Sequence, residues 1–380
     1  MGTRGLPPSY GGYETFADQF VKHMVPLGHE VIVACERPNS GPVPKNYHGA
    51  RLFYFPFKPP RSYRIRKIYE GLNDLYFYFR LAWSCDVMYI LAGLGTQMLL
   101  VLRLIRPGLR IVTNNDGLEW SRSKYNWFER LMWKSFIGSS LRFSHLVIHD
   151  NPRLPEFFPS HGLSKSITID YGVDEIEVMR WDGEFLENTF PDLPTLSNLE
   201  KEGYFIVVAR LQPDNNTQMI IRGFLDSNSE RHLVVVGDVW DSGYEEVLRK
   251  ICQEDSIRRV IFTGGIYNLD ALNMLRKNAF AYLHGHSAGG TNPALLEAMA
   301  MGKAVIAHDN PFNNHVLDHS QMSFQSAGDL ALKINKLEGD SKLVDRLGNE
   351  NYSRTSKNYR WERCFSKHSR AFQIIMGRNG

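Results

Sequence analysis

The sequence predicts an α/β protein with two parallel sheets, arranged as two Rossmann-like domains that face a cleft. Three observations lead to this fold class. The 380 residues suffice for two globular domains, the composition of 43% hydrophobic and 22% charged residues is ordinary for such domains, and short apolar runs alternate with helical stretches. That alternation is typical of βαβ units, whose ligands bind outside the carboxyl ends of the strands.

The apolar runs form two series, separated by an acidic, turn-rich stretch at 174–203. We expect strands of the first domain at VIVACE (31–36), RLFYFPF (51–57), DVMYILA (86–92), RIVTNND (110–116), HLVIHD (145–150) and SITIDYG (166–172). We expect strands of the second at YFIVVAR (204–210), HLVVVGD (232–238), RVIFTGG (259–265), AFAYLHG (279–285) and KAVIAHD (303–309). The domains should therefore span 1–174 and 175–350, and a helical segment at 351–380 should pack back toward the first domain.

Composition argues against several classes of protein. The four cysteines have no CxxC or zinc spacing, so we expect thiols in a reducing compartment and no disulfide framework. No apolar run reaches about 18 residues, and the opening MGTRGLPPSY lacks the apolar region of a signal peptide. We therefore expect a cytosolic protein.

The charge is divided unevenly along the chain. The net charge is +3, yet residues 1–180 hold 22 Lys and Arg against 16 Asp and Glu, which is +6. Basic and aromatic residues interleave at 58–83, which contains Arg61, Arg64, Arg66 and Lys67, and again at 119–136. Such stretches can lie on anionic lipid, although an amphipathic helix with an aromatic core face and a solvated basic face gives the same pattern. Nucleic-acid binding is another possibility, but no recognised module for it is present.

A glycine-rich loop follows the expected strand at 279–285 and opens a helix, in the sequence HGHSAGGTNPALLEAMAMG. Helix starts favour anions, so the amides around Gly289, Gly290, Thr291 and Asn292 form a candidate phosphate site. Glu297 lies a few residues further on, where it can reach the ribose hydroxyls of a bound nucleotide. The alternative is a tight turn with Thr291 or Asn292 as N-cap and Glu297 as a solvated helix residue.

Two further candidates lie at other strand ends. Gly11 and Gly12 form a glycine turn before an amphipathic helix and offer a second anion site, although glycine before a helix is often only turn chemistry. Arg210 ends the first strand of the second domain and suits a diphosphate, because its guanidinium is always charged and bidentate. A surface salt bridge is the alternative for Arg210.

These motifs resemble the retaining GT-B glycosyltransferases of family 4 over nearly the whole chain. The segments GTRGLPPSYGGYETFADQF, NNDGLEWSRSKYNWFERL and GHSAGGTNPALLEAMA are similar to its bacterial rhamnosyltransferase branch. The resemblance implies a nucleotide-sugar donor bound mainly by the second domain, an acceptor on the first, and no metal or other cofactor. It also implies that Arg210 contacts the diphosphate, that Glu297 contacts the ribose, and that the turn at 11–12 approaches the phosphates.

The chain departs from the family pattern at three places. Gly289 stands where the family has a glutamate that recognises the donor sugar, which fits a 6-deoxysugar handled through the backbone and Asn292. Asn215 stands where a lysine is usual, so Arg210 and the helix dipole should carry more of the diphosphate binding. The family has a strand before the first glycine turn, whereas this sequence begins at Met1 with GTRG, so we expect in-frame codons for an apolar strand upstream.

Candidate catalytic residues are Asn115, Asp116 and Arg210. Asn115 and Asp116 end a strand where many relatives have a histidine at the donor sugar, and a carboxylate there can orient the acceptor hydroxyl or the leaving phosphate. An Asp before Gly is equally a standard turn residue. Without an enzymic nucleophile, a donor phosphate oxygen can take the acceptor proton in a same-face displacement. We expect His145, His149, His284 and His286 to be packing or turn residues.

The resulting expectation is a cytoplasmic enzyme, peripheral on the inner face of the plasma membrane. It would move L-rhamnose from dTDP-L-rhamnose to a lipid-linked saccharide, with retention, during assembly of capsule or lipopolysaccharide. A glycosyltransferase of the same fold with another donor sugar is the first alternative. A sugar-nucleotide epimerase is the second, since it shares the two-domain cleft and needs no acceptor surface.

Overall fold

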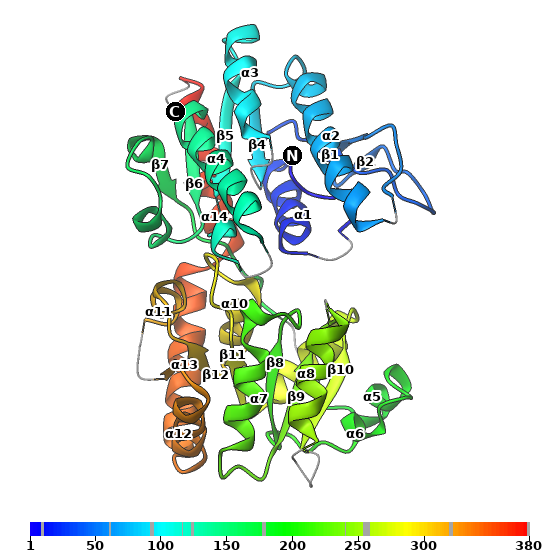
Figure 1. The fold of residues 1–380 in the computed structure, drawn as a ribbon, viewed down its shortest axis with the longest axis vertical. Helices are drawn as coiled ribbons and strands as arrows, with labels where there is room; N and C mark the ends of the chain where they lie inside the picture. The colour runs from blue at the N-terminus through cyan, green and yellow to red at the C-terminus, as the bar shows by residue number, and fades with distance from the viewer. Residues whose placement is uncertain are drawn as a thin grey trace. The chain divides into compact units, whose positions relative to one another are not determined.

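The chain forms two compact units in a computed structural model (Figure 1). The structure describes residues 1–8, 11–60, 62–91, 95–115, 117–122, 125–176, 180–239, 241–253, 259–318 and 322–377. The first unit comprises Met1–Gly172 and Trp361–Gly380, and the second comprises Val173–Arg360. Each unit is an α/β structure with parallel strands, which confirms the predicted fold class.

The first unit contains a three-stranded sheet, in the order β1-β3-β2, and a four-stranded sheet, in the order β4-β5-β6-β7. Every pair is parallel except β2 with β3. The strands are β1 (Ile32–Cys35), β2 (Asn46–Tyr47), β3 (Ala50–Tyr54), β4 (Val87–Leu91), β5 (Arg110–Asn115), β6 (Leu146–His149) and β7 (Ser166–Thr168). The longer helices are α1 (Gly12–Met24), α2 (Tyr63–Leu81), α3 (Leu99–Ile105), α4 (Trp127–Phe143) and α14 (Trp361–Ile375). The 3-10 turns are η1 (Thr96–Met98), η2 (Glu119–Ser121), η3 (Leu154–Phe157) and η4 (Leu163–Lys165).

The first residues of the chain run between the two sheets. The Met1 amine donates to the Tyr89 carbonyl at 2.8 Å, and the Leu91 amide donates to the Met1 carbonyl at 2.8 Å. On the other side, the Glu36 amide donates to the Arg4 carbonyl at 2.9 Å. The strand order therefore reverses at this segment, and the glycine turn before α1 follows directly.

Helix α14 returns to the first unit and packs on α1. Phe16 and Phe20 of α1 meet Phe365 with ring centroids 5.5 and 5.7 Å apart, and the Trp361 ring stacks on Phe365 at 5.4 Å. Helix α13 behaves differently, because Leu343 and Leu347 belong to the core of the second unit. The structure therefore moves the boundary expected at 351 to 361, and only α14 joins the first domain.

The second unit is built on a six-stranded parallel sheet in the order β10-β9-β8-β11-β12-β13. Its strands are β8 (Tyr204–Val208), β9 (His232–Val236), β10 (Val260–Gly264), β11 (Ala281–His284), β12 (Ala304–His308) and β13 (Ser323–Phe324). Its helices are α5 (Gly183–Thr189), α6 (Pro194–Ser197), η5 (Pro213–Asn215), α7 (Thr217–Leu225), α8 (Ser242–Cys252), α9 (Leu269–Asn278), α10 (Pro293–Ala300), α11 (Pro311–Leu317), α12 (Ala327–Glu338) and α13 (Ser341–Asn358).

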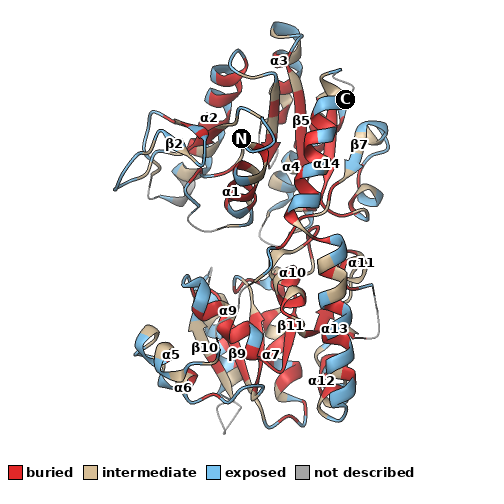
Figure 2. Ribbon diagram, turned by 180° about the vertical axis from the view of Figure 1, so that it is seen from behind, coloured by how far each residue is buried: buried red, intermediate tan, exposed pale blue. Residues whose placement is uncertain are grey.

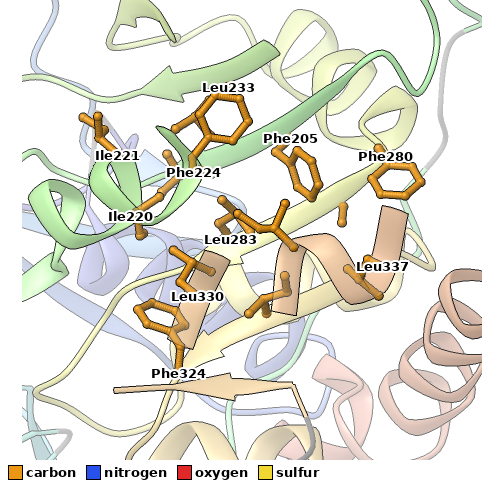
Figure 3. Close-up of a cluster of buried hydrophobic side chains, with 14 of the residues drawn as sticks. Phe205, Ile220, Ile221, Phe224, Leu233, Phe280, Leu283, Phe324, Leu330 and Leu337 are labelled. Carbon is orange, nitrogen blue, oxygen red and sulfur yellow. The ribbon is translucent and has the colours of Figure 1, made fainter. Parts of the chain in front are cut away.

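The central strands of this sheet are buried along almost their whole length, which is why the sequence shows them as continuous apolar runs (Figure 2). A core cluster fills the space between the sheet and helices α7, α8 and α12 (Figure 3). Phe205, Phe224 and Leu330 lie within it. Gly223 permits the close contact of α7 with α12, because a Cβ there would lie 2.7 Å from the Ala327 carbonyl oxygen.

Candidate functional site

The strand order of the second unit reverses between β8 and β11. The chain runs from β8 to β9 and β10 on one side, and then crosses to β11 on the other side of β8. In open α/β sheets ligands bind at such a switch point, outside the carboxyl ends of the strands. Arg210 follows β8, and the glycine-rich loop follows β11, so the sheet brings these two predicted features to the same place.

The loop after β11 has the open backbone that the sequence predicts at the start of α10. Gly289 has a φ of +138°, and a Cβ on it would lie 2.7 Å from Nε2 of His286, so any other residue would be strained at this position. Asn292 is the N-cap of α10, and its Oδ1 accepts from the Ala294 amide at 2.9 Å. Gly290 and Thr291 are buried beside it. The N-cap alternative is therefore present at Asn292, next to the backbone amides predicted to bind phosphate.

Asn215 forms hydrogen bonds with both the segment after β8, which carries Arg210, and the loop after β11, which carries His286. Its Nδ2 donates to the Arg210 carbonyl at 2.7 Å, so Oδ1 is the atom that faces His286 Nδ1, at 2.8 Å. An amide oxygen only accepts, and Nδ1 of His286 must therefore carry the hydrogen. The Ser287 amide and hydroxyl both donate to the Asp214 carbonyl, at 3.1 and 2.8 Å. Asn215 thus has a clear structural role at the position where the family pattern has a lysine.

Glu297 lies in the second turn of α10 and is paired with a buried arginine. Nη2 of Arg276, on α9, lies 2.6 Å from Oε2 of Glu297. The Arg276 side chain is 5% exposed, whereas that of Glu297 is 31% exposed. Glu297 is therefore not the simply solvated helix residue of the alternative interpretation, since a buried cation fixes one carboxylate oxygen and solvent reaches the carboxylate side of the pair.

The glycine turn of the first unit has its own internal anchor. Oε1 of Glu14 accepts from the Arg4 amide at 2.9 Å, and Gly11 has a φ of +143°, at which a Cβ would collide with Oε2 of the same carboxylate. Gly11 is thus explained by the fold of the turn itself. A Cβ on Gly12 would meet no described atom within 4 Å, so the first residue of α1 is the open position of this pair.

The predicted catalytic residues of the first unit are placed in part. Asn115 ends β5 and is buried, and its Nδ2 donates to the Ser140 hydroxyl of α4 at 3.0 Å. This contact holds α4 to the sheet, and a catalytic role for Asn115 stays a prediction. Asp116 lies outside the described residues.

Most of the histidines at strand ends are packing residues, as predicted. Burial lowers the pKa of His149 to about 4 and that of His284 well below its ordinary value, so both imidazoles are neutral. The His149 ring lies 5.1 Å from that of Phe158, and the His284 ring stacks on Tyr282 at 5.9 Å. His145 is used by the backbone, since its Nδ1 accepts from the Ile111 amide at 3.0 Å. Among the described residues, we find no group of histidine, cysteine or acidic side chains arranged to hold a metal ion.

The sequence gives no functional signal for two residues of the second-unit site, Arg276 and His286. Arg276 appears in the last turn of α9, where a cation is ordinary at a helix end, and nothing in its spacing connects it with Glu297. The sequence predicts His286 as a packing or turn residue, although the HxH spacing at the end of β11 places it shortly before the glycines. Their partners, Glu297 and Asn215, lie on other elements, so these contacts are recognised only in the folded structure.

Comparison with known proteins gives two family matches. Residues 193–354 match the model of the glycosyl transferases group 1, and residues 1–174 match that of a domain of unknown function, DUF1972. No curated protein matches the chain.

Solved structures similar to the chain cover nearly all of it. A sucrose-phosphate synthase from Thermosynechococcus elongatus is 16% identical, with a TM-score of 0.77 over 97% of this chain and 94% of that one. HepE from Anabaena, in complex with UDP and glucose, is 15% identical, with a TM-score of 0.69 over 97% of each chain. A glycosyltransferase from Rickettsia africae is 13% identical, with a TM-score of 0.69 over 97% and 96%. The chain therefore has the GT-B fold. The match of residues 193–354 to the glycosyl transferases of group 1 supports glycosyltransferase as its enzyme class.

Proposed function

We propose that the protein transfers L-rhamnose from dTDP-L-rhamnose to a lipid-linked saccharide, with retention, in the synthesis of a bacterial surface polysaccharide such as capsule or lipopolysaccharide. The observation that carries the proposal is the gathering of Arg210, the start of α10 and Glu297 around the switch point of the second unit. The specific donor follows from the motif resemblance described above. The glycosyltransferase class has the additional support of the family match.

In the proposed complex, the diphosphate is bound by Arg210 and by the backbone amides around Gly289, Gly290, Thr291 and Asn292, and Glu297 accepts a hydrogen bond from the ribose. Gly289 offers no side chain to the sugar, so the backbone and Asn292 would handle it. The acceptor oxygen bonds to the anomeric carbon on the face that the diphosphate leaves, and a phosphate oxygen of the leaving group takes the acceptor proton. No metal is required for these steps, because Arg210 and the helix start supply the positive potential.

The sequence suggests membrane contact through the basic residues of 58–83, but two of these residues form ion pairs in the structure. Arg66 pairs with Glu36 at 2.6 Å and with Glu70 at 3.0 Å, and Lys67 pairs with Glu129. These cations are therefore engaged within the first unit. Arg61 and the side chain of Arg64 lie outside the described part of the chain.

Exposed apolar side chains replace those cations as support for membrane contact. The outer face of α2 carries an exposed row with spacings of three and four residues, namely Ile65, Ile68, Leu72, Leu75 and Phe79. Its inner face buries Tyr69, Phe77 and Tyr78 together with the polar residues Asn73 and Asp74. Trp127, Phe128 and Leu131 extend the exposed surface on α4, which the Lys67–Glu129 pair ties to α2. We find no helix among the described residues with the length and apolar character to span a bilayer.

The proposal is tested by incubating the protein with dTDP-L-rhamnose, UDP-glucose and other nucleotide sugars, each with and without lipid-linked saccharide acceptors, and by following products by mass. Transfer from dTDP-L-rhamnose that requires an acceptor is the expected result. Transfer from UDP-glucose instead would support the same fold with another donor, which the UDP named for the similar HepE structures makes the first alternative. Conversion of a nucleotide sugar without any acceptor would point to an epimerase and overturn the proposal.

A further inference from the structure

We infer that Arg276 positions the carboxylate of Glu297 for the ribose of the bound nucleotide. A buried residue outside the glycine-rich motif would thus decide how well the motif's glutamate binds. The inference rests on the proposed ribose role of Glu297, and the experiment below distinguishes the failure of one from the failure of the other.

The two members of the Arg276–Glu297 pair differ in their exposure to solvent. Arg276 reaches Glu297 Oε2 with Nη2 at 2.6 Å, and its Nη1 lies 3.5 Å from the Asn273 Oδ1. Its Nε is buried and has no hydrogen-bond partner among the described residues. The guanidinium is thus enclosed, with 5% of its side chain exposed, while the glutamate keeps 31%. A ligand can approach the glutamate and cannot approach the arginine.

The pair lies against the switch point of the sheet. Tyr282 of β11 is fully buried and donates its hydroxyl to the Val208 carbonyl at the end of β8, at 3.1 Å. Burial raises the pKa of this phenol, while the Arg276 charge lowers it and the Glu297 charge raises it, so both charges lie near the same hydroxyl. The Arg276–Glu297 pair therefore sits beside the two strands whose loops carry Arg210 and the glycines.

Stability alone does not account for such a pair. Desolvating a guanidinium is costly, and an apolar pair of similar volume is often at least as stable as a buried ion pair. A helical glutamate with no ligand needs no buried cation, because solvent satisfies it. The arrangement is explained if the carboxylate must be held in one orientation: Arg276 fixes Oε2, and the second oxygen then meets a ribose hydroxyl without first ordering a flexible side chain.

The test measures discrimination for the ribose hydroxyls by isothermal titration calorimetry, using the intact protein. The ligands are UDP with its 2′,3′-dideoxy analogue, and dTDP with its 3′-deoxy analogue. The wild type should bind the hydroxyl-bearing member of at least one pair about tenfold to a hundredfold more tightly, as expected for a hydrogen bond to a charged acceptor. Arg276→Met should reduce that ratio to about threefold or less while leaving the affinity for the deoxy analogue nearly unchanged.

Further variants serve as controls for Arg276→Met. Arg231→Met breaks another arginine–glutamate pair of the second unit, with Glu338 at 3.1 Å, and should lower stability without changing the ratio. Arg276→Lys restores the charge and should recover part of the ratio, and a ratio no higher than that of Arg276→Met would count against the inference. If Arg276→Met fails to fold, Arg276→Gln takes its place with the same expected loss.

The outcomes separate the two claims. A wild-type ratio in Arg276→Met overturns the positioning role. If the double variant Arg276→Met/Glu297→Gln also keeps the wild-type ratio, Glu297 does not contact the ribose. The proposed function of Glu297 is then wrong, whatever Arg276 does. If the double variant loses the preference for the hydroxyl-bearing ligand and Arg276→Met keeps it, Glu297 contacts the ribose without help from Arg276. The positioning role of Arg276 is then wrong, and the ribose role of Glu297 is retained.

Discussion

At the scale of single residues, the partner of Glu297 changes what its replacement should do. The motif alone suggests that Glu297→Gln weakens donor binding and leaves the fold intact. In the structure, however, Glu297 is the counter-charge of a guanidinium that is 5% exposed, and a glutamine amide oxygen can accept its hydrogen bond but supplies no charge. Removing one member of a buried pair costs up to about 3–5 kcal/mol, so Glu297→Gln should lower the free energy of unfolding substantially. Urea denaturation measures this loss.

The double variant provides the control for that prediction. Arg276→Met/Glu297→Gln removes both charges and should regain most of the stability that Glu297→Gln loses, because no uncompensated charge remains buried. Equal stability of the wild type and Glu297→Gln would show that the pair contributes little and that water reaches Arg276 in the variant.

Arg210 allows a cleaner test of binding, since its side chain is exposed. Arg210→Ala should weaken nucleoside diphosphate binding by about tenfold or more and hardly change nucleoside binding, because the guanidinium is proposed to contact only the phosphates. Binding of UDP and uridine, and of dTDP and thymidine, measures the two effects. Arg249→Ala, at an exposed arginine of α8 paired with Glu245, is the matched control. Equal losses for nucleoside and diphosphate would contradict the assignment.

At the scale of elements, helix α2, which Figure 1 labels in the first unit, has the clearest consequence, because it carries the exposed apolar row. Changing Ile68, Leu72 and Phe79 together to Ser should remove about 3 kcal/mol of apolar burial in a bilayer and release the protein from anionic vesicles. The same three side chains point away from the core, so the unfolding midpoint should hardly move. Vesicle co-sedimentation and urea denaturation measure the two quantities.

Exposed leucines of the second unit supply the control for the α2 variant. Leu269→Ser/Leu332→Ser removes two side chains that are both 68% exposed, and it should leave vesicle binding unchanged. If the α2 variant still binds vesicles, the row does not contact membrane. If the wild type dimerises in sedimentation analysis and the variant does not, the row is an interface between two copies of this chain, which its spacing of three and four residues also suits.

At the scale of the whole molecule, buried imidazoles in both units predict how stability depends on pH. Burial lowers the pKa of His149 and His368 to about 4, and that of His284 well below its ordinary value of 6.5. Their contribution to stability is therefore present above pH 6.5 and is lost as the pH falls toward 4. Over this range the imidazoles bind protons in the unfolded chain but stay neutral in the folded chain. Asp74 opposes this trend, since burial raises its pKa to about 7.

Three further described imidazoles, those of His29, His145 and His308, also have a lowered pKa, and Glu36 joins Asp74 as a carboxyl group with a raised pKa. Six imidazoles against two carboxyl groups leave a net loss of stability on acidification. The urea midpoint should fall steadily from pH 7.5 to pH 5, and return to pH 7.5 should restore it. A midpoint that is constant or rises over this range would show that the imidazoles are protonated in the folded protein, contrary to their burial.

The sequence by itself determined most of the strands and the positions of the glycine turns. Each apolar run that was predicted as a strand coincides with one, because strands covered on both faces must be apolar along their length. The two-residue strands β2 and β13 were not predicted, since neither forms an apolar run long enough to be noticed. The Gly289–Asn292 loop was also predictable, since an open backbone before a helix requires glycine and a capping residue wherever the loop lies in the fold.

Only the tertiary structure decided which side chains meet. Asn215 and His286 are 71 residues apart in sequence, and their contact depends on β8 lying beside β11. Arg276 and Glu297 lie on different helices, and the crossover through β11 brings them together. The same packing placed α13 with the second unit and engaged Arg66 and Lys67 in ion pairs. Spacing along a chain records which face of an element is apolar, but it carries no record of the neighbour that the crossover connections bring to that face.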